Sequence, residues 1–541
     1  MEQAGATTNA ANGSGSVLLT LASAQFLMTL DTSVMNVSIA TVAQDVGTTV
    51  TGIQTAITLY TLVMAMLMIP GGKVGSMIGR KRAFAIGCVI YGCGSLTTSL
   101  AKTLGVLIFG WSFLEGVGAA LILPAIVALV ASNFRTAERS RAYGLVAAAG
   151  AVAVAVGPLI GGLATTYASW RWVFAGEVLV VIVILALSRR IEDAPVEHRP
   201  ELDVFGAVLS ALGLGLAVFG VLRSSEWGLI LPKPDGPSIG GVSPSIALIS
   251  TGILVLWLFT EWERRRERSG SEPLIQMSML QIPQLKGGLV MFFFQFLIQA
   301  GVFFVIPLYL SVALGLSAID TGLRIMPLSV TLLTAAVGVP RYFPGASPRL
   351  VVRLGVLAMF AGIVTLLMAI DVDAGPEIVT IPLLLVGLGI GALASQLGAV
   401  TVSAVPDEQA PEVGGVQNTA TNLGASVGTA LAGSFLIVML TSSFLSGIQG
   451  NPAVPKEVSA RASVELASGI PFVSDTQLSD GLASAGVAPE TTQAIVDANA
   501  QARLDGLKAA LSILAALSLL GLFASRRIPA TPVQASTAAA A

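Results

Sequence analysis

Long apolar segments alternate with short polar ones along almost the whole chain. A helix needs about 20 apolar residues to cross the hydrocarbon core of a bilayer, and fourteen segments have roughly that length or more. We therefore predict spans at residues 17–40, 51–71, 83–101, 104–131, 142–166, 172–188, 203–222, 244–261, 286–312, 319–340, 350–370, 378–402, 413–440 and 506–525. An even number of spans places both ends of the chain on one side of the membrane.

The composition is that of a membrane protein. Of the 541 residues, 54% are hydrophobic and only 11% are charged, and the mean hydropathy is +0.83. A soluble protein carries about a quarter charged residues. The alternating pattern of a β-barrel is missing, and only helices or closed barrels span a bilayer. The predicted fold class is an all-α integral membrane protein with 14 transmembrane helices.

The basic residues indicate the orientation. Most of the 29 lysine and arginine residues lie in segments on the same side as the N-terminus, and such an excess is typical of the cytoplasmic side. We predict a multi-pass protein of the cell membrane with both termini in the cytoplasm. The run EWERRRERSG after the eighth span is most simply a solvated stop, with anionic-lipid contact as the alternative.

Several kinds of chemistry are excluded by missing residues. His198 is the only histidine and lies in a charged loop, which excludes a histidine-based metal site or catalytic dyad. A phosphate-binding loop fails because Leu67 stands where the pattern G-x-x-x-x-G-K needs its first glycine. We expect no enzyme activity, no metal and no cofactor, and no nucleic-acid partner.

Two acidic residues lie deep in predicted spans. Asp31 is midway along the first span, and Glu115 lies in the fourth, roughly 17 Å below its outer end. Glu177 lies in the first turns of the sixth span, nearer the outer surface. A charge at membrane depth costs several kcal/mol, so such a group is protonated, paired or faces water. We favour a functional role for Asp31 and Glu115 over a protonated side chain bonded to the backbone.

Glycines mark two further segments. After the second span, GGKVGSMIGRKRA combines turn-forming glycines with a basic cluster, and we predict a tight gating loop with Gly72, Gly79, Arg80, Lys81 and Arg82. The fifth span reads YGLVAAAGAVAVAVGPLIGG, in which small residues recur at helical spacing and a proline can bend the helix. Its candidate motif comprises Gly150, Gly157, Pro158, Gly161 and Gly162, with simple helix packing as the alternative.

Polar side chains inside apolar spans are candidates for a substrate cavity. Gln295 and Gln299 lie one turn apart in MFFFQFLIQAGVFF, and Trp111 lies one turn before Glu115. An aromatic face beside a carboxylate suits a lipophilic cation, although aromatic packing against lipid is equally plausible. The full candidate set is Asn36, Trp111, Gln295, Gln299, Gln396, Asn418 and Asn422.

Together these segments resemble the major facilitator superfamily, specifically its fourteen-span drug:proton antiporter family. The resemblance is carried by LDTSVMNVSIA, GGKVGSMIGRKR, GPLIGG, SWRWVF and GGVQNTATNLGASVG. It implies two six-helix bundles around a central cavity, spans seven and eight inserted between them, and alternating access by rocking of the bundles. It also implies that the fifth-span motif marks an antiporter, and that Asp31 and Glu115 border the cavity and approach each other.

The chain departs from the family pattern at three positions. Ser76 replaces an acidic residue of the first loop, and Ser112 replaces an arginine that the family links to proton coupling. Ala40 replaces a proline at the end of the first span. Glu115, where glutamine is common, is the candidate replacement proton carrier.

The resemblance and the spans divide the chain into parts. These are a disordered cytoplasmic tail (1–16), an N-terminal six-helix bundle (17–188), two inserted transmembrane helices (203–261), a C-terminal six-helix bundle (286–525) with an extracytoplasmic loop (443–505), and a cytoplasmic tail (526–541).

The expected function is proton-coupled efflux of amphipathic, cationic small molecules by a monomer that contacts membrane lipids. One alternative keeps the fold but exports an endogenous lipid or metabolite. A third possibility is a membrane sensor or scaffold that uses the 443–505 loop.

Overall fold

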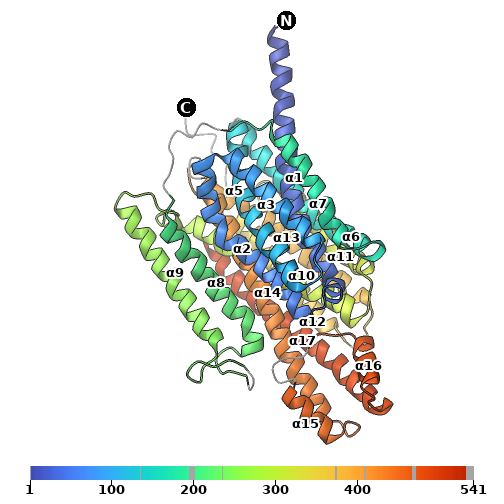
Figure 1. Ribbon diagram of the computed structural model, residues 1–541. Helices are drawn as coiled ribbons and strands as arrows, with labels where there is room; N and C mark the ends of the chain where they lie inside the picture. The colour runs from blue at the N-terminus through green and yellow to red at the C-terminus, as the bar shows by residue number, and fades with distance from the viewer. Residues whose placement is uncertain are drawn as a thin grey trace.

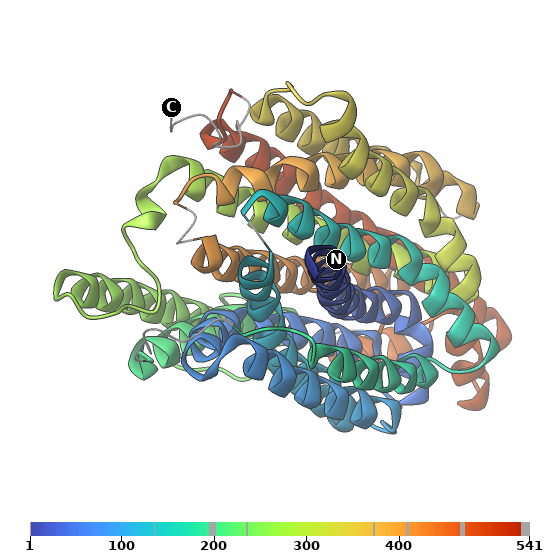
Figure 2. The same ribbon diagram turned by 90° about the horizontal axis from the view of Figure 1, so that it is seen from above.

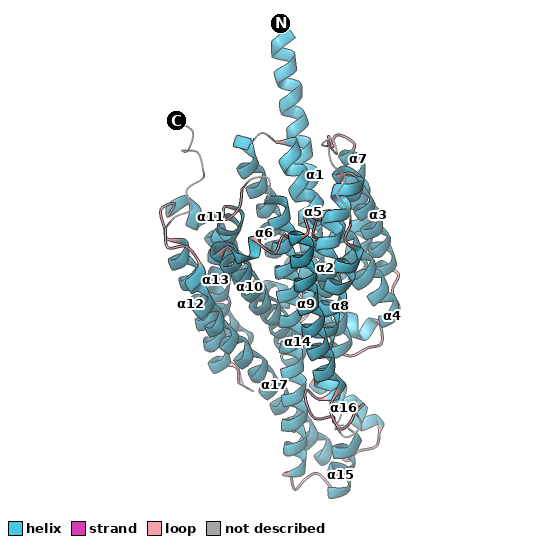
Figure 3. Ribbon diagram, turned by 90° about the vertical axis from the view of Figure 1, so that its left-hand side faces the viewer, coloured by secondary structure: helices cyan, strands magenta, loops and turns pink. Residues whose placement is uncertain are grey.

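The structure is a computed structural model, which describes residues 2–134, 136–193, 202–233, 236–371, 374–406, 410–465 and 471–531. The regular elements in these ranges are helices (Figures 1 and 3), apart from a single β-bridge between Ile239 and Val242. Thirteen helices of the described chain are long and apolar enough to cross a membrane. The predicted all-α membrane fold is therefore confirmed.

The fourteenth predicted span is α3 (Arg80–Ser99), which is 20 residues long but less apolar than the others. Its first turn carries three basic residues, and its end is rich in serine and threonine. It nevertheless packs against α5 and α7 inside the N-terminal half of the molecule. Fourteen helices are thus arranged as spans, although α3 is not apolar enough to be recognised as a span from its hydropathy alone.

The N-terminal bundle is built from the first six spans. Neighbouring helices pack as α1 with α6, α2 with α5, and α3 with α5 and α7. Its elements are α1 (Glu2–Asp45), α2 (Val50–Ile78), α3, α4 (Leu104–Leu107), the π-helix η1 (Ile108–Glu115), α5 (Gly116–Asn133), α6 (Thr136–Tyr167) and α7 (Arg171–Ser188).

The C-terminal bundle repeats this plan, with α10 against α14, α11 and α12 against α13, and α14 against α17. Its elements are α10 (Pro283–Leu308), η3 (Tyr309–Ala313), α11 (Ala318–Tyr342), α12 (Pro348–Ala369), η4 (Pro376–Val379), α13 (Thr380–Val402), α14 (Ala410–Gln449) and α17 (Pro489–Ala524), followed by η6 (Ser525–Arg527). The two bundles meet along α2 with α14 and α6 with α11.

The inserted helices, α8 (Val204–Trp227) and α9 (Pro244–Arg268), form a hairpin on one side of the molecule (Figures 1 and 2). Helix α8 packs on α2 of one bundle and on α14 of the other. The Ser434 hydroxyl on α14 donates to the Val221 carbonyl on α8. The insertion therefore lies across the α2–α14 contact, while α9 forms the outer layer.

Glycines let equivalent helices pack closely in both bundles. A Cβ added at Gly157 of α6 would overlap the Ser33 side chain of α1, and one at Gly161 would lie 2.9 Å from the Val34 Cα. In the C-terminal bundle, a Cβ at Gly424 or Gly428 of α14 would overlap backbone atoms of α10. The predicted close approach at the small-residue pairs is confirmed, because only the missing side chains permit these distances.

The predicted disordered tail at 1–16 is wrong. Helix α1 begins at Glu2, so residues 2–16 continue the helix of the first span (Figure 1). Extending an existing helix needs no new nucleus, and this segment contains several alanines. Helices also occupy both ends of the predicted 443–505 loop, since α14 continues to Gln449 and α17 starts at Pro489.

Between these helices lie α15 (Lys456–Glu465) and α16 (Asp475–Ser484), which project from the end of the molecule opposite the start of α1 (Figure 3). The buried Arg503 of α17 donates to the Val473 carbonyl at 2.8 Å and to Asp475 at 2.6 Å. A charged side chain thus fixes the start of α16 onto the extended end of α17.

The predicted gating loop is a one-residue turn. Helix α2 continues to Ile78, so Gly72 is helical, and only Gly79 (φ +99°) separates α2 from α3. Such a positive φ favours glycine. The Lys81 ammonium donates to the Arg189 carbonyl at 3.0 Å, and the Lys81 N–H donates to Asp193 at 3.3 Å. These contacts join the turn to the end of α7.

A Gly157→Ala variant tests the α1–α6 contact. The added methyl group overlaps Ser33, and overpacking of this kind lowers the free energy of unfolding by about 1–3 kcal/mol. We expect a lower thermal midpoint for the purified protein in detergent. Gly176→Ala on α7, where an added Cβ meets nothing within 4 Å, is the matched control. Equal midpoints for the two variants would contradict the packing argument.

Candidate functional site

Three acidic side chains meet inside the N-terminal bundle. Asp31 on α1, Glu115 at the end of η1 and Glu177 on α7 each bring a carboxylate oxygen to within 4.8 Å of the other two. Asp31 and Glu115 are completely buried, and Glu177 is 2% exposed. The predicted approach of Asp31 and Glu115 is therefore present, with a third carboxyl group added to it. We call these three residues the carboxyl triad.

Each acid of the carboxyl triad has a neutral hydrogen-bond donor. The Trp111 indole Nε1 donates to both oxygens of Asp31 at 2.8 Å. The Thr98 hydroxyl donates to Glu115 Oε1 at 3.2 Å, and the Ser95 hydroxyl donates to Glu177 Oε2 at 3.0 Å. One oxygen of Glu115 and one of Glu177 have no partner in the described part of the chain.

Aromatic rings enclose the carboxyl triad. The Tyr60 ring of α2 stacks on Trp111 with 5.0 Å between the centroids and 12° between the planes. Tyr60 and Tyr91 are fully buried, and neither hydroxyl has a partner among the described residues. The acids therefore lie in an apolar, aromatic interior that nevertheless contains unused polar atoms.

Local backbone features bring these groups together. Trp111 and Glu115 both belong to the π-helix η1, a conformation found mostly in short pieces and frequently at functional sites. A Cβ at Gly94 of α3 would lie 2.8 Å from both the Glu115 N and the Gly110 O, so α3 can approach η1 only with glycine there. This close approach places the donors Ser95 and Thr98 beside the acids.

The setting differs from the prediction in one respect. The contacts of the carboxyl triad come from α1, α2, α3, η1 and α7, all of the N-terminal bundle, rather than from a cavity between bundles. Trp111, a predicted cavity residue, is instead the donor to Asp31 and is 0% exposed. An indole N–H donates to a buried carboxylate without adding charge.

Glu177 was missed because its depth was judged from the start of its helix. It lies six residues after Arg171, only about 9 Å along α7. The signal that could have found it is its position as the only acid in the apolar run WVFAGEVLVVIV. Side-chain length allows Glu115 and Glu177 to meet from different depths.

The charge of the carboxyl triad is not balanced by a basic residue. No lysine or arginine in the described chain pairs with the three acids. Ser112, which replaces the family arginine, donates its hydroxyl to the Ala56 carbonyl on α2 at 2.8 Å. Three ionised carboxylates at this separation in an apolar interior repel one another strongly. The site can therefore take up protons, and its oxygen atoms could also hold a hard cation.

The glycine motif of the fifth span joins the two bundles. Gly150 and Gly157 of α6, which are two turns apart, both face α1. On another side of α6, a Cβ at Gly162 would lie 2.7 Å from the Ala318 O of α11, and a Cβ at Gly322 would overlap the Pro158 carbonyl. The motif thus contacts both α1, which carries Asp31, and the opposite bundle.

The remaining predicted cavity residues are not among the hydrogen-bond donors to the carboxyl triad in the described chain. Gln295 and Gln299 lie on α10 and are 2% and 9% exposed, and the Oε1 atom of each has no partner in the described chain. The others are Asn36 on α1, Gln396 on α13, and Asn418 and Asn422 on α14. Their role in binding substrate stays a prediction.

Two lysines in and before the predicted gating loop have separate partners. Lys81 binds the end of α7, as described above, while Arg80 and Arg82 flank it at the start of α3. Lys73, earlier in the same motif, forms a 3.0 Å ion pair with Glu272 in the segment after α9. Ser76 donates to the Lys73 carbonyl. Lys73 thus joins the end of α2 to the segment that follows the inserted hairpin.

Comparison with known proteins decides the family. The model of the Major Facilitator Superfamily matches residues 21–429. The chain belongs to this superfamily. It is similar to a probable actinorhodin transporter of Streptomyces coelicolor (28% identical, 82% of this chain and 75% of the relative) and to a puromycin resistance protein of Streptomyces alboniger (30% identical, 76% and 80%). A multidrug resistance protein of Mycobacterium tuberculosis is 24% identical over 82% of this chain and 79% of its own length.

Solved structures show the same fold. A bacterial homologue of the human lysosomal transporter Spinster, inward-facing and unoccupied, aligns with a TM-score of 0.60 at 13% identity over 95% of this chain and 98% of that one. The human organic anion transporter MFSD10 aligns with a TM-score of 0.54 at 13% identity over the same shares. This member of the superfamily is a multi-pass membrane transporter rather than an enzyme, and its relatives support a role in efflux.

A Trp111→Phe variant tests the support of Asp31. It keeps the aromatic stack with Tyr60 but removes the only donor to Asp31 in the described chain. Leaving a buried acceptor without its partner costs about 1–3 kcal/mol, so the thermal midpoint should fall. Tyr60→Phe, which removes a hydroxyl with no partner in the described residues, should leave it nearly unchanged. The opposite order of the two midpoints would refute the assignment.

Proposed function

We propose that the protein exports amphipathic, cationic small molecules in exchange for protons, and that the carboxyl triad binds and releases those protons. The observation that carries the proposal is the meeting of three buried acids within 4.8 Å without a basic partner among the described residues. Ionisable groups inside a membrane protein are rare and are functional in most cases. The names of two of the relatives, a puromycin resistance protein and a multidrug resistance protein, support the direction of transport.

Proton exchange follows from the electrostatics of the carboxyl triad. With its protons bound, the site is neutral and needs only the donors already present. When protons leave, the remaining charges repel one another in a medium that screens them weakly. The deprotonated state is therefore stable only if water, a cation or a rearrangement of helices compensates it. A transporter can use this difference to link proton release to a change of conformation.

Helix α1 offers a direct mechanical connection. Asp31 lies two and three residues before Ser33 and Val34, which contact the glycines of α6. Helix α6 in turn contacts α11 of the opposite bundle through Pro158 and Gly162. A small shift of α1 on protonation would therefore reach the joint between the bundles. In this proposal the tight glycine contacts make α1, α6 and α11 move together, so that the shift is not confined to α1.

Substrate recognition is assigned to the amides of the C-terminal bundle. The unpartnered Oε1 atoms of Gln295 and Gln299 are buried acceptors, and an N–H group of a cationic ligand would satisfy them. Neighbouring phenylalanines on α10 would cover its apolar part. The transporter would act as a monomer driven by the proton gradient without a cofactor, with both termini in the cytoplasm.

Transport into proteoliposomes tests the proposal. Wild-type protein should move ethidium against an imposed pH gradient, and collapse of the gradient should stop this transport. Asp31→Asn, Glu115→Gln and Glu177→Gln should each reduce gradient-driven transport by roughly 5- to 150-fold, the span of typical coupling free energies. Substrate exchange without a gradient should survive, because the C-terminal amides are intact.

A control variant and two further measurements test the coupling ion and the substrate class. Asp480→Asn, an exposed acid on α16, is the matched control and should transport normally. Uptake driven by a sodium gradient at equal pH would overturn proton coupling and give the carboxyl triad a different ion. Export of a lipid or metabolite with no transport of ethidium would overturn the proposed substrate class.

A further inference from the structure

The predicted cytoplasmic end of α9 carries four arginines, and only two of them have a partner among the described residues. Arg265 pairs with Glu261 at 3.4 Å, and Arg266 pairs with Asp203 at 3.2 Å and donates to the Glu272 carbonyl. Arg264 and Arg268 are exposed and form no ion pair within the described residues. These two arginines are four residues apart, so their guanidinium groups lie on one face of the helix.

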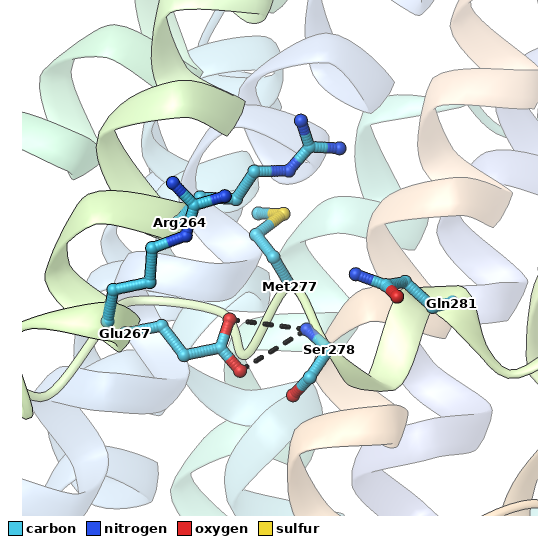
Figure 4. A pocket seen from close by; sticks show the side chains of 6 residues that line it. Arg264, Glu267, Met277, Ser278 and Gln281 are labelled. Atoms are coloured by element: carbon cyan, nitrogen blue, oxygen red, sulfur yellow. Dashed lines mark hydrogen bonds between the residues drawn. The ribbon is translucent and has the colours of Figure 1, made fainter.

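The two unpaired arginines line a shallow pocket. Its other lining residues are Glu267, Met277, Ser278 and Gln281. Arg264 and Gln281 lie on opposite sides of the pocket, with Met277 and Ser278 between them (Figure 4). Both oxygens of Glu267 accept the Ser278 N–H, at 3.3 and 3.2 Å. Two guanidinium groups therefore face one carboxylate that is already engaged, and the pocket has a net positive charge.

The arginine face continues into an apolar face. Ile253 and Trp257, each 59% exposed, lie eleven and seven residues before Arg264. At 100° per residue these positions and Arg268 form one stripe along α9. Trp257 is about 10 Å from Arg264 and about 16 Å from Arg268 along the axis. Tryptophan is enriched at the boundary between hydrocarbon and headgroups, so the stripe passes from acyl-chain depth to headgroup depth.

We propose that this stripe is a binding site for an anionic phospholipid. Its phosphate binds Arg264 and Arg268, and the Gln281 amide and Ser278 hydroxyl at the rim can donate to headgroup oxygens. An acyl chain lies along Ile253 and Trp257. A soluble phosphate would use the arginines but not the apolar stripe, whereas a lipid uses both.

The site also has a structural consequence. The pocket includes the segment after α9, and Glu272 in that segment pairs with Lys73 of the N-terminal bundle. The same segment packs through Leu274, Ile275 and Met277 against apolar residues that include Val413 of α14. A lipid bound at the pocket would thus hold the end of the inserted hairpin to both bundles.

Single charge-neutralising variants of the full-length protein test the proposal. Binding of phosphatidylglycerol is measured by native mass spectrometry in detergent, with phosphatidylcholine as the neutral lipid. Each arginine near an anionic lipid is worth about fivefold in affinity. We expect R264Q and R268Q to weaken phosphatidylglycerol binding about fivefold each, and the double variant to weaken it about 25-fold. R265Q, which removes the same charge one residue away, should change it by less than about twofold.

Four results would overturn the proposal. Equal weakening by R264Q, R268Q and R265Q would show a diffuse electrostatic effect rather than a site. Equal binding of phosphatidylcholine and phosphatidylglycerol by wild type would remove the phosphate-charge argument. Displacement of the lipid by millimolar inorganic phosphate, or binding unchanged by W257A, would assign the arginines to a soluble anion. Thermal midpoints measured without added lipid should match wild type for every variant, which excludes misfolding as the cause.

Discussion

The burial of three acids at one point is the constraint on which the N-terminal bundle depends. Asp31, Glu115 and Glu177 come from three helices, and their oxygens meet without a basic partner in the described chain. Neutral donors satisfy them: the Trp111 indole and two hydroxyls of α3. Placing these donors requires α3 to approach η1 closely, which Gly94 permits. The packing of α3 on η1, the π-helix itself and the hydroxyl side chains of α3 thus all serve one electrostatic requirement. This requirement is a hydrogen-bond donor for each of the three buried acids.

Helix α1 connects this requirement to the rest of the molecule. The same helix carries Asp31 and the residues that fill the glycine positions of α6, and α6 touches the opposite bundle. Close backbone packing transmits displacement because a well-packed interior has little free volume. The matching contact of α14 on α10 shows that the two bundles use one packing device. The inserted hairpin covers the contact between α2 and α14, where α8 touches both of these helices.

Much of the fold could be read from periodicity and composition. Thirteen of the fourteen predicted spans are long, apolar helices in the described chain, and the fourteenth is the less apolar helix α3. The insertion after the sixth span and the small-residue face of α6 also depend on local pattern, and the structure agrees with both. Boundaries were less predictable. Residues 2–16 look polar but extend a helix, and Gly72 looks like a turn but is helical, because neighbouring helical turns override weak local preferences.

The sequence by itself determined that acids lie inside the membrane, because a lone carboxyl group in an apolar run is visible in one dimension. Only the tertiary structure decided which acids meet and what satisfies them. Glu177 and Trp111 are far from Asp31 along the chain, and their approach depends on how α7 and η1 pack against α1. It also depends on close contacts at glycines between helices, and no local sequence pattern shows which helix each glycine will meet. Contacts between helices are set by shape and burial, which a linear pattern does not contain.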